Sequence, residues 1–114
     1  MDEPEALAAF AALAQETRLR LLRRFVRAGP EGVSAGAAAE AVDVSPSNVS
    51  FHLKELERAG LVRSRRDGRS IIYAADYDAI GELVRFLMED CCSGRPEICA
   101  PGLSPRACAE TADG

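Results

Sequence analysis

Apolar residues recur at helical spacing in two segments at the start of the chain. The first segment covers residues 4–14 and predicts an alanine-rich helix. Its apolar stripe consists of Leu7, Phe10, Ala11 and Leu13. The second segment covers Glu16–Ala28 and stops at Gly29-Pro30, a pair typical of a turn. One face of this predicted amphipathic helix carries Leu19, Leu22, Phe25 and Val26, with arginines around them.

Two more helices are expected in the middle of the chain. A short one covers residues 34–42, and a tight turn around Asp43-Val44 follows it. Ser45 then caps a longer helix, with proline at its first position and Gly60 just past its end. Within this longer helix, one face is apolar and is expected to pack inward; it holds Val49, Leu53 and Leu56.

A hairpin and a last helix complete the pattern. The runs 61–65 and 70–74 resemble strands, and Asp67-Gly68 between them predicts a tight turn in which both residues take positive φ. Asp76 is a candidate cap for the final helix, whose apolar stripe holds Tyr77, Ile80, Val84, Leu87 and Met88. Because glycine and proline recur from residue 93 onward, we expect a folded domain over residues 1–92 and a flexible tail over residues 93–114.

This order of elements is mainly α with a small β-hairpin, and it predicts a winged helix-turn-helix. In that fold the helix after the turn enters the major groove of DNA. The helix that begins at Ser45 carries polar groups and one aromatic suited to phosphates and base edges, namely Ser45, Ser47, Asn48, Ser50, Phe51, His52 and Lys54. For His52, which lies beside the apolar stripe, a structural role is the alternative. The hairpin adds arginines for phosphates or a narrow minor groove, chiefly Arg65, Arg66 and Arg69. A solvated helix face and a charged turn remain the alternative for the whole set.

The charge pattern is compatible with a nucleic-acid partner although the formal net charge is −4. Residues 16–70 carry eleven basic against seven acidic side chains, whereas residues 1–15 and 71–114 are both acidic. Phosphate binding needs a local basic face and not a basic whole. A chain of 114 residues fits one domain, and no segment is long and apolar enough to span a bilayer. We expect a cytoplasmic protein that binds double-stranded DNA and no membrane.

All four cysteines lie in the last quarter of the chain, and Cys91-Cys92 comes at the end of the last predicted helix. In a cytoplasmic chain such a terminal cluster indicates metal or redox chemistry. The adjacent Cys91 and Cys92 have Cα atoms only about 3.8 Å apart, which is too close for an ordinary disulfide. This pair is suited to coordinating one soft ion, with Cys99 as a third donor. Three sulfur ligands without histidine favour As(III) or Sb(III). Zinc normally takes four ligands, which Cys108 would complete, so zinc, cadmium and lead stay open.

Two other interpretations of the cysteines stay open. One is a thiol switch, for instance Cys92 with Cys99, and the other is that the cysteines are incidental. An enzyme is not expected, because the chain has no Cys-x-x-Cys motif and no histidine base accompanies the cysteines.

Three stretches of the sequence resemble the ArsR/SmtB family of repressors. Residues 47–62 (SNVSFHLKELERAGLV) and 65–73 (RRDGRSIIY) are similar to the family's recognition helix and wing, and residues 16–22 (ETRLRLL) to the start of its second helix. The resemblance covers roughly residues 5–90. It implies a homodimeric transcriptional repressor whose first and last helices form the dimer interface, with Leu7, Phe10, Ile80, Val84, Leu87 and Met88 in the contact.

The resemblance also bears on the inducer. Many members carry Cys-x-Cys in the helix before the recognition helix and others use histidine in the last helix, but residues 34–40 hold no cysteine and the last helix holds no histidine. The cysteines resemble instead those of an arsenic-responsive subclass, which has a vicinal pair and one more cysteine after the last helix. This implies Cys91, Cys92 and Cys99 as ligands and As(III) as the inducer that releases DNA, with Sb(III) or methylarsenite as alternatives. In that subclass the vicinal pair alone can suffice for methylated arsenicals.

Overall fold

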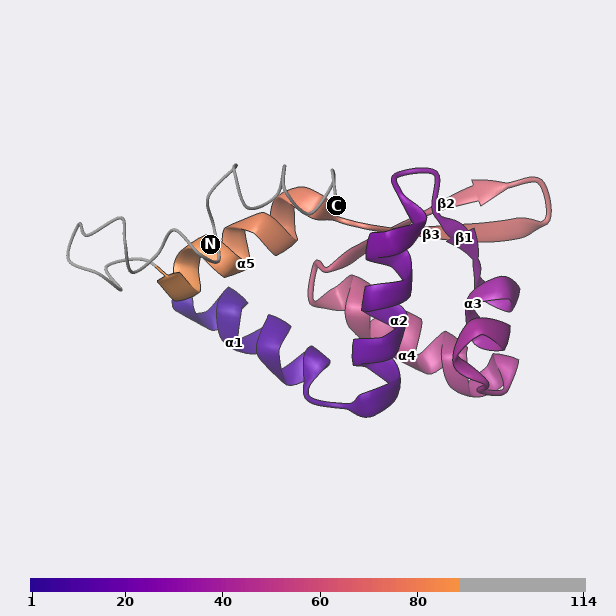
Figure 1. The fold of residues 1–114 in the computed structure, drawn as a ribbon, viewed down its shortest axis with the longest axis horizontal. Helices are drawn as coiled ribbons and strands as arrows, with labels where there is room; N and C mark the ends of the chain where they lie inside the picture. Colours follow the sequence, from indigo (N-terminus) through magenta and orange to yellow (C-terminus); the bar gives the residue numbers. More distant parts are fainter. Residues whose placement is uncertain (89–114) are drawn as a thin grey trace, which may run out of the picture.

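Short polar side chains begin the helices close to where the sequence predicts them. The computed structural model describes residues 1–88 (Figure 1). Its elements, in chain order, are α1 (Glu3–Leu13), α2 (Glu16–Ala28), β1 (Val33–Ser34), α3 (Ala35–Val42), α4 (Pro46–Arg58), β2 (Val62–Asp67), β3 (Ser70–Ala75) and α5 (Tyr77–Met88). The side chains of Ser34, Ser45 and Asp76 accept hydrogen bonds from the first-turn N–H groups of α3, α4 and α5, which have no partner within the helix.

The sheet has three antiparallel strands in the order β1-β3-β2. Strands β2 and β3 form the predicted hairpin, with Arg63 opposite Ala74 and Ser64 opposite Tyr73. Strand β1 was not predicted. Its residue Val33 pairs with Tyr73 of β3, its residue Ser34 pairs with Ile72, and α3 follows immediately. Two residues are too few for an alternating pattern to be recognised. The winged helix-turn-helix fold is confirmed, with one short strand added between the second and third helices.

The hairpin turn lies one residue later than predicted. Asp67 pairs with Ser70, so the two turn residues are Gly68 and Arg69 and not Asp67-Gly68. Gly68 has φ +65°, and no positive φ occurs at Asp67 or Arg69. A positive φ at the first turn residue alone is the pattern of a type II′ turn, which requires glycine only there. The expectation of positive φ at both Asp67 and Gly68 was therefore wrong.

The core lies where α2, α4 and the hairpin meet. Its fully buried large side chains include Leu21, Phe25, Val49, Leu53, Leu56 and Leu61. The inward face of α4 is as predicted, but that of α2 is rotated, because Leu21 is buried whereas Leu19 and Val26 are exposed. The α2 face that packs against α4 and the sheet therefore runs through Leu21, Leu22 and Phe25.

Helix α1 packs onto the rest of the chain through alanines and Leu13, and it leaves Leu7 and Phe10 exposed. Ala6, Ala9 and Ala12 are buried, while Leu7 is 61% exposed and Phe10 37%. Figure 1 shows α1 beside α5 at one end of the molecule, away from α3 and the hairpin. Among the residues described, no helix is both long and apolar enough to cross a membrane.

Replacement of Gly32 by alanine is expected to destabilise the fold. Gly32 has φ +78°, and a Cβ there would collide with the backbone oxygen of Tyr73, directly beside the β1–β3 pairing. Gly32→Ala should lower the free energy of unfolding by about 1–3 kcal/mol, measured by urea denaturation. Gly36→Ala is the matched control, because this helical glycine faces open space and alanine should stabilise α3 by about 0.5–1 kcal/mol. Equal stability of the two variants would contradict the predicted clash.

Candidate nucleic-acid interface

The outward face of α4 is polar with one large aromatic side chain. The exposed residues predicted to contact DNA are Ser47, Asn48, Ser50, Phe51 and Lys54. Phe51 is 59% exposed although its neighbour Leu53 is fully buried. An exposed phenyl ring between small polar groups offers an apolar surface that suits contact with a thymine methyl. The structure therefore gathers these five residues on one uncovered surface of the helix.

The start of α4 is set by a tight turn after α3. Asp43 adopts the left-handed conformation (φ 56°, ψ 53°), and the Val44 N–H donates to the Ala39 carbonyl at 3.0 Å. Ser45 follows as the cap; its Oγ accepts from the Asn48 N–H at 3.4 Å and lies 3.5 Å from the Ser47 hydroxyl. The exposed N-terminal end of α4 thus presents hydroxyls and backbone N–H groups, which suit a phosphate.

The hairpin, here called the wing (Val62–Ala75), is joined to the far end of α4. The Ser64 hydroxyl donates to Glu57 Oε2 at 2.6 Å. Side chains two apart on a strand share a face, so Arg66 points to the same side of the wing as Ser64, toward α4. Arg69 lies in the turn at the tip. Among residues 1–88, neither Arg66 nor Arg69 has an ion-pair partner, so both are available to phosphates.

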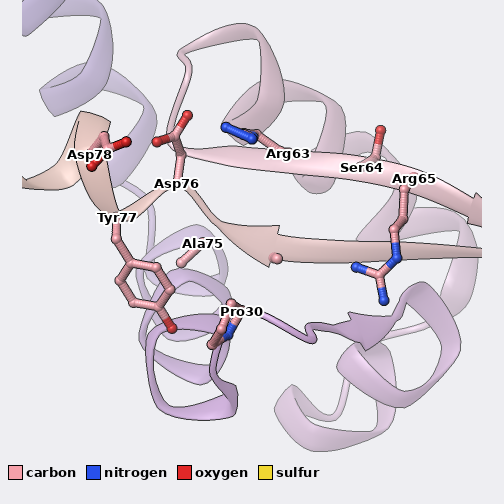
Figure 2. Close-up of a pocket in the computed structure, with 9 residues that line it drawn as sticks. Pro30, Arg63, Ser64, Arg65, Ala75, Asp76, Tyr77 and Asp78 are labelled. Atoms are coloured by element: carbon pink, nitrogen blue, oxygen red, sulfur yellow. The ribbon is translucent and has the colours of Figure 1, made fainter.

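Arg65 lies on the opposite side of the wing from Arg66. Its guanidinium donates to the Glu31 carbonyl at 2.8 Å, which ties the wing to the loop after α2. Figure 2 shows a shallow hollow at the base of the wing, with Arg65 toward one end, Asp76 and Tyr77 toward the other, and Arg63 between them in this view. The Tyr77 hydroxyl donates to the Val26 carbonyl at 2.9 Å and fixes the start of α5 there. Arg65 therefore supports the wing, in contrast to the free arginines toward its tip.

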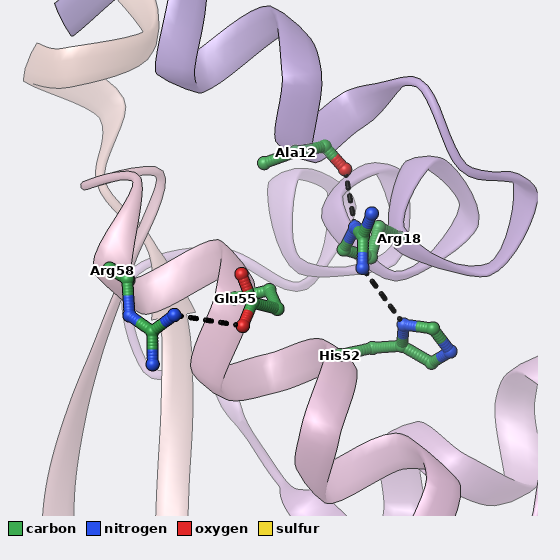
Figure 3. A network of polar contacts seen from close by, with 5 residues as sticks. All are labelled: Ala12, Arg18, His52, Glu55 and Arg58. Atoms are coloured by element: carbon green, nitrogen blue, oxygen red, sulfur yellow. Dashed lines mark hydrogen bonds and ion pairs between the residues drawn. The ribbon is translucent and has the colours of Figure 1, made fainter.

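His52 lies apart from the exposed row of α4. Its side chain is half-buried, and Nδ1 is 3.3 Å from an Nη atom of Arg18 in α2 (Figure 3). Burial lowers the pKa of His52 below its ordinary value of 6.5, and the positive charge of Arg18 lowers this pKa further. This placement favours a structural role for His52 over a direct contact with DNA. Arg18 itself was not singled out in the sequence, where it is one of several arginines on α2.

The predicted ligand cysteines Cys91, Cys92 and Cys99 lie outside the described residues, as does Cys108. Within residues 1–88, no group of three or more His, Cys, Asp or Glu side chains is placed to hold a metal ion. The metal site therefore stays a prediction.

Comparisons with known proteins agree with this geometry. Residues 13–65 match a family model described as a helix-turn-helix domain. The nodulation protein NolR of Rhizobium meliloti is 34% identical over 89 residues, which cover 77% of this chain and 70% of NolR. An ArsR-like transcriptional regulator from Rhodococcus sp. RHA1 superposes with a TM-score of 0.69 at 31% identity, covering 85% of this chain and 89% of that one. The AntR antimony-specific transcriptional repressor superposes at 0.59 with 33% identity, covering 74% and 75% respectively.

The capped α4, the wing beside it and these relatives define the class of protein. The chain is a winged helix-turn-helix transcriptional regulator and not an enzyme. Within that class it belongs to the ArsR/SmtB family.

Proposed function

We propose that this chain is a homodimeric repressor that binds double-stranded operator DNA and releases it when trivalent arsenic binds Cys91, Cys92 and Cys99. The observation that carries the DNA-binding part is the exposed face of α4, where Phe51 and small polar residues lie uncovered beside a wing with free arginines. Two copies would place their α4 helices in successive major grooves, with half-sites about one helical turn apart.

The dimer is supported by the apolar surface that α1 and α5 leave open. Leu7 and Leu87 are each 61% exposed, and Phe10 and Val84 are partly exposed. The other two predicted interface residues, Ile80 and Met88, are half-buried, and Ile80 packs against the core. Large apolar side chains that gather on two neighbouring helices mark a protein–protein contact. Because a second copy carries the same surface, a two-fold contact would cover both.

The proposed inducer is supported by the chemistry of the donor set. The chain keeps all four of its cysteines within its last 24 residues, and its one histidine is in α4. Thiolates without imidazole favour thiophilic As(III) or Sb(III). The similarity to AntR, whose name states antimony specificity, points the same way. For release to occur, the ion must bind the form with low DNA affinity more tightly than the DNA-bound form.

The wing supplies a test of DNA binding. The double variant Arg66→Glu/Arg69→Glu should lower affinity for a selected duplex by on the order of 10- to 100-fold, because each reversal removes an attraction to phosphate and adds repulsion. The slope of log K against log salt should also fall by about one for each arginine that no longer neutralises a phosphate. Fluorescence anisotropy at several salt concentrations measures both quantities.

The matched control is Arg23→Glu/Arg27→Glu, which makes the same charge change on exposed positions of α2. It should reduce affinity much less, since these residues lie outside α4 and the wing. If the two double variants weakened binding equally, only overall charge would matter and the wing would have no specific role.

A further inference from the structure

A single side chain, Arg18, joins three helices. It lies in the first turn of α2, where its backbone N–H donates to the side chain of Gln15 at 2.9 Å. Its Nε donates to the carbonyl of Ala12, in the last turn of α1, at 2.6 Å. Its Nη1 is 3.3 Å from His52 Nδ1, in the middle of α4. Figure 3 shows the guanidinium between the end of α1 and the imidazole.

The chemistry of this contact determines the proton state of His52. A guanidinium has only N–H donors and no acceptor, so Nδ1 must offer its lone pair. The imidazole is then neutral and carries its proton on Nε2. The Ala12 carbonyl is one of the last-turn carbonyls that a helix leaves without an internal partner, so Arg18 satisfies it as well. The Arg18 guanidinium thus donates hydrogen bonds to acceptors on two different helices, the Ala12 carbonyl and His52 Nδ1.

The surroundings of His52 make its charged form unfavourable. Arg18 on α2 is the charged group that faces it, and α1 contributes the Ala12 carbonyl and alanine side chains to the groove between α1 and α4. On α4 itself, Glu55 is engaged by Arg58 at 3.1 Å. Burial and the charge of Arg18 both lower the pKa of His52. Protonation would place two cations against each other and remove the acceptor.

We propose that Arg18 is a positioning residue that ties the recognition helix to the end of α1, and that the tie holds only while His52 is neutral. Phe51, the exposed aromatic of the recognition surface, directly precedes His52, and their rings lie 5.5 Å apart. The orientation of α4 about its axis, and with it the position of Phe51, is therefore linked to α1. This inference rests on the proposed DNA-binding function.

The sign of the pH dependence tests the proposal. Because the folded-state pKa of His52 is lowered, the hydrogen bond from Arg18 is complete above about pH 6.5 and breaks as the pH falls through that lowered value. Affinity of the full chain for a duplex of about 30 base pairs, selected by this protein from a random pool, should be constant near pH 8 and fall about tenfold toward pH 5. A direct contact between protonated His52 and a phosphate would give the opposite sign, with tighter binding in acid.

Three variants separate positioning from charge. Arg18→Gln should lower affinity about tenfold near pH 8, whereas Arg23→Gln, which removes the same charge from an exposed site on α2, should change it much less. His52→Asn puts a carbonyl oxygen close to the place of Nδ1 without a titrating group. It should bind as the wild type does near pH 8 and lose the acid dependence. His52 is the chain's single histidine, so an acid transition of the wild type at a pH below the ordinary histidine pKa of 6.5 can be assigned to it.

Nitrogen-15 NMR of the imidazole gives a reading that does not need DNA. The Nε2–H tautomer is expected in the wild type, and Arg18→Gln should raise the pKa of His52 toward 6.5. An Nδ1–H tautomer, equal affinity of Arg18→Gln and Arg23→Gln, or tighter binding in acid would each overturn the positioning role. Failure of the wild type to select or bind any duplex near pH 8 would overturn the proposed function and this inference together.

Discussion

Leu87→Glu is expected to leave the protein monomeric and to lower its affinity for operator DNA at least about 100-fold. Leu87 is 61% exposed on α5, and the proposed dimer would bury it against a second copy. A carboxylate there would have to lose its hydration without a partner, which costs far more than the apolar contact contributes. A monomer holds one half-site only, so the contribution of the second half-site to binding disappears.

Sedimentation equilibrium measures this effect directly. The variant should show a mass of 12.2 kDa, and the wild type twice that value. Ala41→Glu is the control, because it adds the same charge at an exposed position of α3, at the other end of the molecule (Figure 1). It should stay dimeric. A Leu87→Glu protein that kept the dimer mass would show that α1 and α5 do not form the interface.

Cys91→Ser and Cys92→Ser are each expected to abolish release of DNA by arsenite while leaving affinity without arsenite unchanged. A serine hydroxyl is a hard donor that stays protonated at neutral pH, so it cannot replace a thiolate on As(III). The two thiolates that remain leave the coordination of a three-coordinate As(III) ion one ligand short. Anisotropy of the DNA complex, titrated with arsenite under reducing conditions, measures the response.

Two further cysteine variants refine this prediction. Cys108→Ser should respond to arsenite almost normally, and a strong loss would indicate a four-sulfur site of the kind that suits zinc, cadmium or lead. Cys99→Ser should lose its response to arsenite but keep a response to methylarsenite, which offers fewer coordination positions and can be held by the vicinal pair. Release by arsenite from Cys91→Ser or Cys92→Ser would rule out the proposed ligands.

The recognition helix and its cap could be predicted because local chemistry determines them. Ser45 and the proline after it set the start of α4, and Val49, Leu53 and Leu56 recur on one face, so both its position and its inward side follow from spacing alone. The inward side of α2 could not be predicted in the same way. Its apolar residues spread over about half of its circumference, and only packing against α4 and the sheet selects Leu21 over Leu19.

Other features depend on contacts between residues that are distant in the sequence. Helix α1 buries Ala6, Ala9 and Ala12 and leaves Leu7 and Phe10 exposed, and its own apolar spacing does not distinguish these two sets. Strand β1 forms only because β3 passes beside it. The contact between Arg18 and His52 spans 34 positions, and neither residue type marks it in the sequence. The DNA contacts and the cysteine site stay predictions that rest on the chemistry of the side chains.

The most direct test of the proposed function is release of a labelled duplex from the wild-type protein under reducing conditions, followed by fluorescence anisotropy. Arsenite, methylarsenite, zinc and an oxidant are added separately to the same complex. We expect arsenite to return the anisotropy to that of free DNA and zinc to leave it unchanged. A complex that survives arsenite but dissociates with diamide or peroxide would contradict the arsenic response and identify a thiol switch instead.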